Sequence, residues 1–380
     1  MKIPLEFPKI IFLIFTLLFS SCEEGTNGGI KEINSIHPLQ KLKFSHESFI
    51  ESVNDSNKSI LFGDILIYKD KIISFYCEFP DKVGDFQPTQ ICSNISDNEG
   101  KTWKEKEVII GNKGKSNLGA PNLLQLENGK ILFIYYKKYT YDRTDILAKF
   151  SSDTCKTWTN SIIINKNEKY YTINNGRAII TENNRIIIPV AYRDNYEDGK
   201  PFRSTCFYSD DYGVTWKEST NSVTSPMRGA MEPGIVELSS GNLLMIIRTQ
   251  TGRVWFSRSN NNGKSWEKPY ETSLESPESP STIFSHNNIL YLIHNPNYNA
   301  NIFHYGERTP LQCSVSYDFG ASWQDFSLIE ENINYYYDYA SVKVFRDKIY
   351  LLFNFKRKSK KQFKIKFKVY NIHKIHLLKK

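Results

Sequence analysis

Two charged residues mark the ends of an apolar hairpin in the middle of the chain. Glu232 stands directly before the apolar stretch at residues 235–238, and Arg248 ends the partner stretch after the turn at Gly241. Because the two strands of a tight hairpin run antiparallel, these two positions lie at the same end of the hairpin, opposite the turn. A carboxylate can accept or donate a proton and a guanidinium can bind an anion, so we expect proton transfer and anion binding at this end of the hairpin.

Other candidate residues occupy similar places near other predicted hairpins. Arg177 follows Asn174-Asn175-Gly176, and Arg308 stands in Glu307-Arg308-Thr309-Pro310. A run of tyrosines at residues 335–339 precedes the last hairpin. The seven His are scattered without the spacing of metal ligands, and the Cys form no close pairs. The sequence therefore predicts no metal, no cofactor and no disulfide framework.

A repeated motif shows which elements position these residues. Ser209-Asp-Asp-Tyr-Gly-Val-Thr-Trp216 has four relatives, which begin at Ser96, Ser151, Ser259 and Ser316, so that the copies lie 50 to 58 residues apart. Ser and Asp side chains bond backbone amides in a turn, Gly supplies a positive φ, and Trp fills the gap between strands. Cys155 replaces the Gly in the second copy, where we expect strain.

The spacing of the repeat predicts the fold. One four-stranded propeller blade needs about 40 to 50 residues, and strand-turn-strand patterns lie between the copies. Six hairpins and five motifs predict an all-β chain folded as a six-bladed β-propeller over residues 37–376. Residues near 41–49 are placed to supply the last strand of blade six and so close the ring.

The motif resembles the Asp-box, or BNR repeat, of the sialidase superfamily, and the resemblance covers about residues 58–356. It implies Glu232 as the general base, with Arg248 and Arg308 as binders of the substrate carboxylate. It implies Tyr339 as the nucleophile, with Tyr337 as the competing register. The general acid is Asp85 by the same resemblance, with Asp81 as the alternative.

The chemistry of an acidic sugar explains this choice of residues. A carboxylate on the anomeric carbon repels a carboxylate nucleophile, whereas a neutral phenol activated by a nearby Glu is not repelled. Sialidases open blade one with Arg-Ile-Pro, but this chain has Leu61-Phe62-Gly63-Asp64 there and no arginine. Arg177 is the expected substitute, or else it binds a hydroxyl or a uronate.

Composition limits the partners of the chain. Its 380 residues are 40% hydrophobic and 14% aromatic, which excludes disorder, and the net charge is +8. Much of the basic excess lies in residues 356–368, KRKSKKQFKIKFK. We interpret this run mainly as a solvated strand edge, with weak binding of anionic glycan or phosphate as the alternative. A glycan substrate, no nucleic acid and a monomer are expected.

The first residues of the chain are typical of a targeting signal rather than of part of the folded domain. Lys2 and Lys9 precede a short apolar run that ends in Phe19-Ser20-Ser21-Cys22, which resembles a bacterial lipobox. Residues 1–21 are then a signal peptide, Cys22 carries lipid, and residues 22–36 form a tether. The protein is expected to be held in the cell envelope, at the outer membrane or cell surface, through this lipid alone.

Three functions agree with these patterns. The first is an exo-glycosidase that removes a terminal acidic sugar, most simply sialic acid, with retention through a tyrosyl intermediate. The second is a propeller glycosidase or lyase directed at uronates, which the missing blade-one arginine favours. The third is a non-catalytic glycan-binding lipoprotein.

Overall fold

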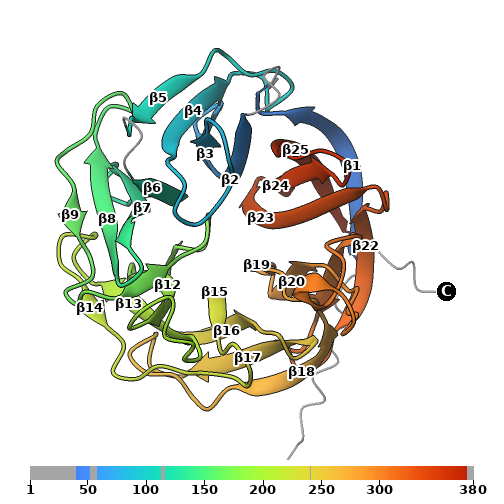
Figure 1. Ribbon diagram of the computed structural model, residues 1–380. Helices are drawn as coiled ribbons and strands as arrows, with labels where there is room; N and C mark the ends of the chain where they lie inside the picture. Colours follow the sequence, from blue (N-terminus) through green and yellow to red (C-terminus); the bar gives the residue numbers. More distant parts are fainter. Residues whose placement is uncertain (1–39, 52–57, 113–115, 240, 375–380) are drawn as a thin grey trace, which may run out of the picture. The chain divides into compact units, whose positions relative to one another are not determined.

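In the computed structural model, the described part of the protein is a ring of six β-sheets (Figure 1). It comprises residues 40–51, 58–112, 116–239 and 241–374. The predicted signal peptide, Cys22 and tether lie outside these residues. Within them, no helix is long and apolar enough to cross a membrane. The six-bladed β-propeller predicted from the repeat is confirmed.

Each blade is a meander of antiparallel strands, with its first strand nearest the centre of the ring. Blades one and two contain β2 (Ser59–Tyr68), β3 (Lys71–Phe79), β4 (Gln90–Ser96), β5 (Glu107–Ile110), β6 (Asn117–Gln125), β7 (Ile131–Thr140), β8 (Arg143–Ser151) and β9 (Ile162–Ile163). Blade three contains β10 (Tyr170–Thr172), β11 (Ile179–Ile180), β12 (Ile186–Arg193), β13 (Arg203–Ser209) and β14 (Lys217–Glu218).

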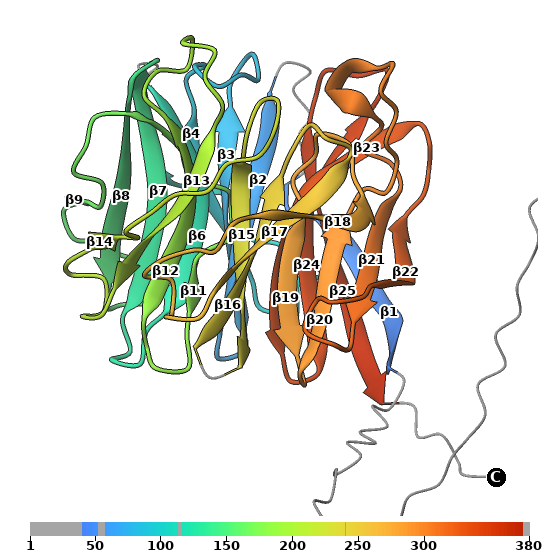
Figure 2. The same ribbon diagram turned by 90° about the horizontal axis from the view of Figure 1, so that it is seen from below.

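The remaining blades repeat this order, and the sheets stand side by side when the ring is seen from its edge (Figure 2). Blade four contains β15 (Met231–Ser239), β16 (Asn242–Arg248), β17 (Arg253–Ser259) and β18 (Tyr270–Glu275). Blade five contains β19 (Thr282–His286), β20 (Ile289–His294), β21 (Leu311–Ser316) and β22 (Gln324–Glu330), with the short 3-10 turn η1 (Phe303–Tyr305) before β21. Blade six contains β23 (Tyr335–Phe345), β24 (Lys348–Arg357), β25 (Lys364–Lys374) and β1 (Gln40–Phe49).

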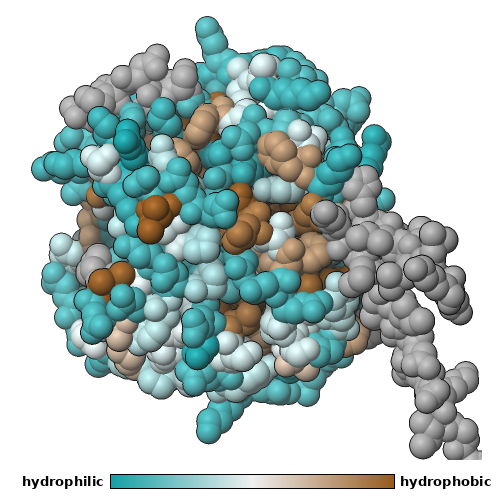
Figure 3. All heavy atoms as spheres, turned by 90° about the vertical axis from the view of Figure 1, so that its right-hand side faces the viewer, coloured by the Kyte–Doolittle hydropathy of each residue, from teal (hydrophilic) through white to brown (hydrophobic). Residues whose placement is uncertain are grey.

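The ring closes as predicted, because β1 pairs antiparallel with β25 at the outer edge of blade six. Two lysines of the basic run stabilise this closure. Lys366 Nζ lies 2.6 Å and Lys368 Nζ 2.7 Å from Glu330 Oε1 of blade five, and both also pair with Glu47 of β1. Seen from this side, the surface is mostly hydrophilic, with apolar side chains in separate patches (Figure 3).

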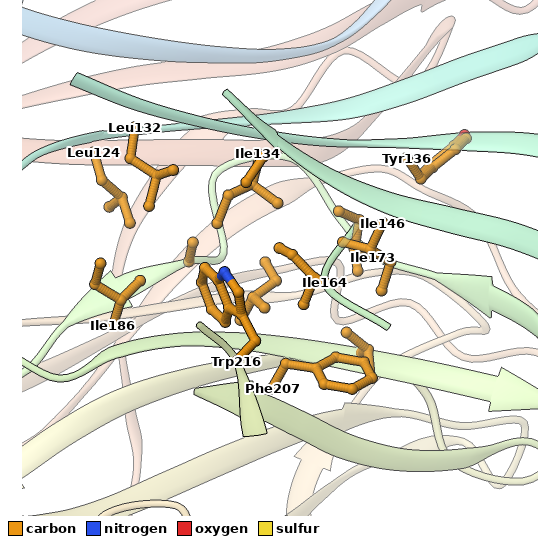
Figure 4. Packing of buried hydrophobic residues seen from close by; sticks show 14 of the residues in the cluster. Leu124, Leu132, Ile134, Tyr136, Ile146, Ile164, Ile173, Ile186, Phe207 and Trp216 are labelled. Atoms are coloured by element: carbon orange, nitrogen blue, oxygen red, sulfur yellow. The ribbon is translucent and has the colours of Figure 1, made fainter. Parts of the chain in front are cut away.

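The Asp-box turns follow their predicted chemistry. Asp211 Oδ1 accepts hydrogen bonds from Ser209 Oγ at 2.7 Å and from the amide of Thr215 at 2.8 Å. Trp216 packs with Ile186 and Phe207 between blades two and three (Figure 4). In the second copy Cys155 has a φ of +66°, so a residue with a Cβ adopts the conformation expected of Gly.

The first strands of four blades share a local irregularity. In β2, β6, β15 and β23 the pairing register shifts by a β-bulge close to the centre of the ring. The residues with positive φ at these bulges are Phe62, Ala120, Glu232 and Tyr339. A bulge bends its strand and redirects a side chain, so this repeated feature decides which residues enter the channel mouth.

Candidate active site

Two of these bulges carry Glu232 and Tyr339, which meet across the channel. The hydroxyl of Tyr339 donates a hydrogen bond to Glu232 Oε1 at 3.0 Å, although the residues are 107 positions apart. Both have positive φ, +41° at Glu232 and +50° at Tyr339. Such a conformation costs a residue with a side chain about 1 to 3 kcal/mol and is concentrated at functional sites. The hydrogen bond across the channel, between two residues that each stand at a bulge, therefore marks the pair as the centre of the site.

Arg248 links this pair to the rest of the site. Its guanidinium donates to Glu232 Oε2 and lies 3.4 Å from the hydroxyl of Tyr339. Burial lowers the pKa of Arg248, but the carboxylates of Glu232 and Glu278 outweigh burial and raise it above its usual range. Burial and the Glu232 carboxylate both raise the pKa of Tyr339. At neutral pH the site therefore holds a neutral phenol beside a permanently charged guanidinium.

Arg308 and Phe62 enclose the Tyr339 ring. The guanidinium carbon of Arg308 lies 5.8 Å from the ring centroid, and the Phe62 ring meets it edge-on at 4.6 Å. Arg308 Nη1 also donates to Asp338 Oδ2 at 2.5 Å. The ring can therefore turn little, and its hydroxyl is held toward Glu232.

Phe62 stands at the blade-one position where the sequence lacks an arginine. Its backbone amide donates to Asn354 Oδ1 at 2.9 Å, and Asn354 Nδ2 donates to Asp338 Oδ1 at 2.8 Å. Asn354 and Asp338 are 1% and 4% exposed. A buried chain of hydrogen bonds therefore runs from blade one through Asp338 to Arg308, and an apolar side chain stands at the sequence position where an arginine was expected.

Glu278 is a site residue that the sequence reasoning missed. It precedes the first strand of blade five, just as Glu232 opens blade four, so the same positional rule could have found it. Its side chain is 2% exposed. Its carboxylate oxygens meet Arg228 at 2.5 Å, Gln250 at 3.1 Å, His304 at 3.2 Å and Arg248 at 3.4 Å. Burial raises the pKa of Glu278, but these donors outweigh burial and lower it to about 2.

We expect this lowered pKa to make stability depend on pH. Because the folded-state pKa lies below the ordinary value of 4.5, Glu278 stabilises the fold above pH 4.5 and loses that effect as pH falls toward 2. Glu278→Gln should lower the free energy of unfolding by about 3 kcal/mol at pH 6, and by about half that at pH 3. Urea unfolding at both pH values measures this difference. An equal loss of unfolding free energy at pH 6 and pH 3 would contradict the prediction. The control is Glu275→Gln, because the side chain of Glu275 is 52% exposed.

Asp85 lies at the rim of the site, beside a buried lysine that the sequence reasoning also missed. Its side chain is 57% exposed, and its Oδ1 accepts a bond from Lys138 Nζ at 3.2 Å. Lys138 is 2% exposed at the side chain and also donates to the hydroxyl of Tyr170 at 2.9 Å. Lys138, followed by Arg248 and Arg228, lowers the pKa of Asp85, so this carboxyl is ionised at neutral pH.

The structure does not bring Arg177 to this group. It is 3% exposed and donates to the carbonyls of Asn175, Ala340 and Ser281 at 3.3, 2.8 and 2.9 Å. Asn175 Nδ2 donates to the carbonyl of Tyr339 at 3.1 Å. The blade-three turn thus braces the bulge that carries Tyr339, and both terminal nitrogens of the Arg177 guanidinium are occupied by backbone carbonyls. This arrangement differs from its expected contact with substrate.

The two alternatives left open by the sequence lie elsewhere. Tyr337 is 1% exposed in the core between blades five and six, and its hydroxyl donates to the carbonyl of Asn332 at 3.2 Å. Asp81 is exposed and is absent from the residues that line the central cavity. The structure therefore places Tyr339 and Asp85, rather than Tyr337 and Asp81, beside the other candidates.

The candidates that the structure brings together line one cavity of about 750 Å³: Asp85, Glu232, Arg248, Glu278, Arg308 and Tyr339. Three guanidiniums reach it, those of Arg228, Arg248 and Arg308. Arg228 was not predicted, and its side chain is 32% exposed. Chemically, the cavity can bind an anion through the guanidiniums and present a phenol to an electrophilic carbon, with Glu232 placed to take the phenol's proton. The described residues contain no group of three or more side chains suited to hold a metal ion.

Comparison with known proteins agrees with the architecture. The family described as BNR repeat-like domain matches residues 85–351. No curated protein matches the sequence. A protein of unknown function from Dyadobacter fermentans is similar in structure with a TM-score of 0.68 at 17% identity, covering 87% of this chain and 99% of that one.

Two sialidases are similar in structure at lower coverage of their own length. A Trypanosoma rangeli sialidase mutant that displays trans-sialidase activity has a TM-score of 0.64 at 16% identity, with 87% of this chain and 58% of that chain covered. The NanB sialidase from Streptococcus pneumoniae has a TM-score of 0.64 at 14% identity, with 86% and 70% covered. This chain thus spans little more than half of the trypanosomal protein. At such identities the likeness establishes the fold alone.

Proposed function

Because this chain belongs to the BNR repeat-like domain family, we propose that it is an exo-acting glycoside hydrolase that removes a terminal acidic sugar, most simply sialic acid. The observation that carries the proposal is the 3.0 Å hydrogen bond from Tyr339 to Glu232 inside a cavity that Arg248 and Arg308 also line. The similarity to sialidases supports a glycosidase-like fold.

The proposed reaction has two steps. In the first, the Tyr339 oxygen bonds to the anomeric carbon, its proton passes to Glu232, and the glycosidic bond breaks as the leaving oxygen takes a proton from the protonated form of Asp85, whose share grows as pH falls. In the second, water attacks the anomeric carbon and gives one proton to Asp85, while the Tyr339 oxygen leaves and recovers its proton from Glu232. Two displacements retain the configuration of the sugar.

The electrostatics of the cavity suit an anionic sugar. Arg248 and Arg308 would bind its carboxylate, and a neutral phenol does not repel that charge as a carboxylate nucleophile would. The raised pKa of Tyr339 keeps the proton on the phenol until the new bond forms. Arg228 is placed to be the third guanidinium in the absence of a blade-one arginine.

A slow substrate provides the direct test. Incubation with 2,3-difluorosialic acid should add one sugar to the protein, because fluorine beside the anomeric carbon slows release of the glycosyl enzyme. Peptide mass spectrometry should locate the addition on Tyr339, and turnover of a fluorogenic sialoside should stop in parallel. If the wild type shows no addition and no turnover, the proposal is refuted. Addition at another residue would refute the role of Tyr339.

The Asp85–Lys138 pair gives a pH prediction. A general acid must be protonated, so activity falls as pH rises above its pKa, and Lys138 holds the pKa of Asp85 low. Lys138→Met keeps most of the buried volume and removes this charge. We expect the high-pH limb of kcat/KM to move upward by about one pH unit. Lys137→Met, one residue away on the same strand, should leave the limb in place, and a limb unmoved in Lys138→Met would exclude Asp85 as the acid.

One observation favours a second candidate function. Asp85 is ionised at neutral pH, and an elimination from a uronate needs no proton from it. The Tyr339 oxygen, its proton held by Glu232, would remove the hydrogen beside the uronate carboxyl group, a C=C bond would form, and the leaving oxygen would take a proton from the phenol. Ultraviolet absorbance of an unsaturated uronate would rise with polyuronate substrates. No rise in absorbance would exclude this reaction.

A further inference from the structure

A second cavity borders the central one at blades five and six. Its volume is about 470 Å³, and it shares Ile302, His304 and Arg308 with the central cavity. Its remaining wall includes Tyr336, Lys356 and Phe363. A ligand that fills the central cavity could therefore continue past Arg308 into this side cavity.

Lys356 is the first residue of the basic run at residues 356–368. The lysines of this run differ in whether they form ion pairs. Lys366 and Lys368 pair with Glu330 and Glu47 at the closure of the ring. Lys358 Nζ lies 2.5 Å from Glu307 Oε2. Strand closure and local pairing account for these three cations, but they do not account for Lys356.

Lys356 stands between two aromatic rings of the side cavity. Its Nζ lies 5.5 Å from the ring centroid of Tyr336 and 4.9 Å from that of Phe363. Tyr336 is also its cross-strand partner between β23 and β24. In the part of the chain that the structure describes, no ion pair joins Lys356 to a carboxylate. Its ammonium is thus held in place by rings rather than neutralised.

The carboxylates of the side cavity are already occupied. Asp338 accepts from Arg308 at 2.5 Å and from Asn354 at 2.8 Å, and Glu307 pairs with Lys358. Each of these two acidic side chains therefore pairs with a cation other than Lys356, and neither neutralises the charge of Lys356. A cation between aromatic faces suits a ring-shaped ligand that carries a negative charge, because the rings pack against its apolar face and the ammonium donates hydrogen bonds to its anion.

We propose that the side cavity is a subsite for a second anionic sugar, next to the terminal acidic sugar held in the central cavity. The inference rests on the proposed function, and it narrows the substrate class to glycans in which two acidic sugars are neighbours. Lys356 is the specificity-determining residue, and Tyr336 and Phe363 form the walls that orient the second ring.

Binding separates this inference from catalysis. The probes are an oligosaccharide of two linked sialic acids and sialyllactose, in which the same terminal sugar is joined to a neutral disaccharide. Calorimetry uses the full chain with Tyr339→Phe, so that neither probe is consumed. Adding Lys356→Gln should weaken binding of the doubly acidic probe about tenfold and that of sialyllactose less than twofold. Lys360→Gln, an exposed lysine in the adjoining turn, should change neither.

The outcomes separate the two proposals. Equal weakening for both probes, no weakening, or no binding of the doubly acidic probe would overturn the subsite. If the wild type turns over a fluorogenic sialoside but Lys356→Gln shows no selective loss, the subsite alone is wrong. If no sialoside is turned over but the selective loss occurs, the proposed hydrolysis is wrong and the subsite stands.

Discussion

Tyr339→Phe is expected to lower kcat for a fluorogenic sialoside by about 10³-fold. The change removes only the hydroxyl that donates to Glu232 Oε1 at 3.0 Å. The ring and its edge-on contact with Phe62 remain, so the variant should fold as the wild type does. Glu232→Gln should lose a similar factor, because an amide cannot take the phenol's proton. Initial rates across substrate concentrations measure both.

Tyr337→Phe is the matched control for this prediction. It makes the same chemical change two residues earlier on β23, where the hydroxyl donates to the carbonyl of Asn332. We expect full activity and a loss of about 1 kcal/mol in the free energy of unfolding. Equal activity of Tyr339→Phe and Tyr337→Phe would rule out a tyrosyl intermediate at residue 339.

Arg248→Met should have the second largest effect. Arg248 is 7% exposed at the side chain and contacts Glu232, Glu278 and the hydroxyl of Tyr339. Its loss removes a binder of the substrate carboxylate and leaves two buried carboxylates short of a cation. We expect kcat/KM to fall about 10³-fold, mostly through a higher KM, and the free energy of unfolding to fall by about 3 kcal/mol.

Arg253→Met in the same blade separates this effect from a general loss of charge. Arg253 is 38% exposed and pairs with Glu275 at 3.4 Å. An exposed pair of this kind contributes about 0 to 1 kcal/mol, so stability and activity should both stay near the wild type. An Arg248→Met variant with unchanged KM would show that the substrate's anion is bound elsewhere.

The tyrosine run shows where sequence reasoning reaches its limit. Strict alternation along a strand places Tyr337 and Tyr339 on the same face, so the pattern alone leaves both registers open. The bulge between Asp338 and Ser341 breaks the alternation and turns Tyr339 into the channel, while Tyr337 enters the core. No residue in the run requires a bulge there, because Tyr339 adopts a positive φ without being Gly.

The fold and the shortest-range contact of the site follow from the amino-acid sequence. Each Asp-box is a local turn whose hydrogen bonds join residues about four positions apart, so five copies specify the blades directly. Glu232 and Arg248 lie in one hairpin, whose pairing of Met231 with Arg248 brings them to the same edge. Short-range pairing of this kind follows from residue types and turn lengths alone.

The remaining contacts of the site join residues that are far apart in the chain. Lys138 reaches Asp85 across 53 residues, Tyr339 reaches Glu232 across 107, and Phe62 reaches Asn354 across 292. Arg177, expected to contact substrate, instead binds carbonyls of blades five and six. These pairings depend on how six blades pack around a closed ring and on where each bulge bends its strand. No local pattern in the chain encodes the blade packing or the positions of the bulges.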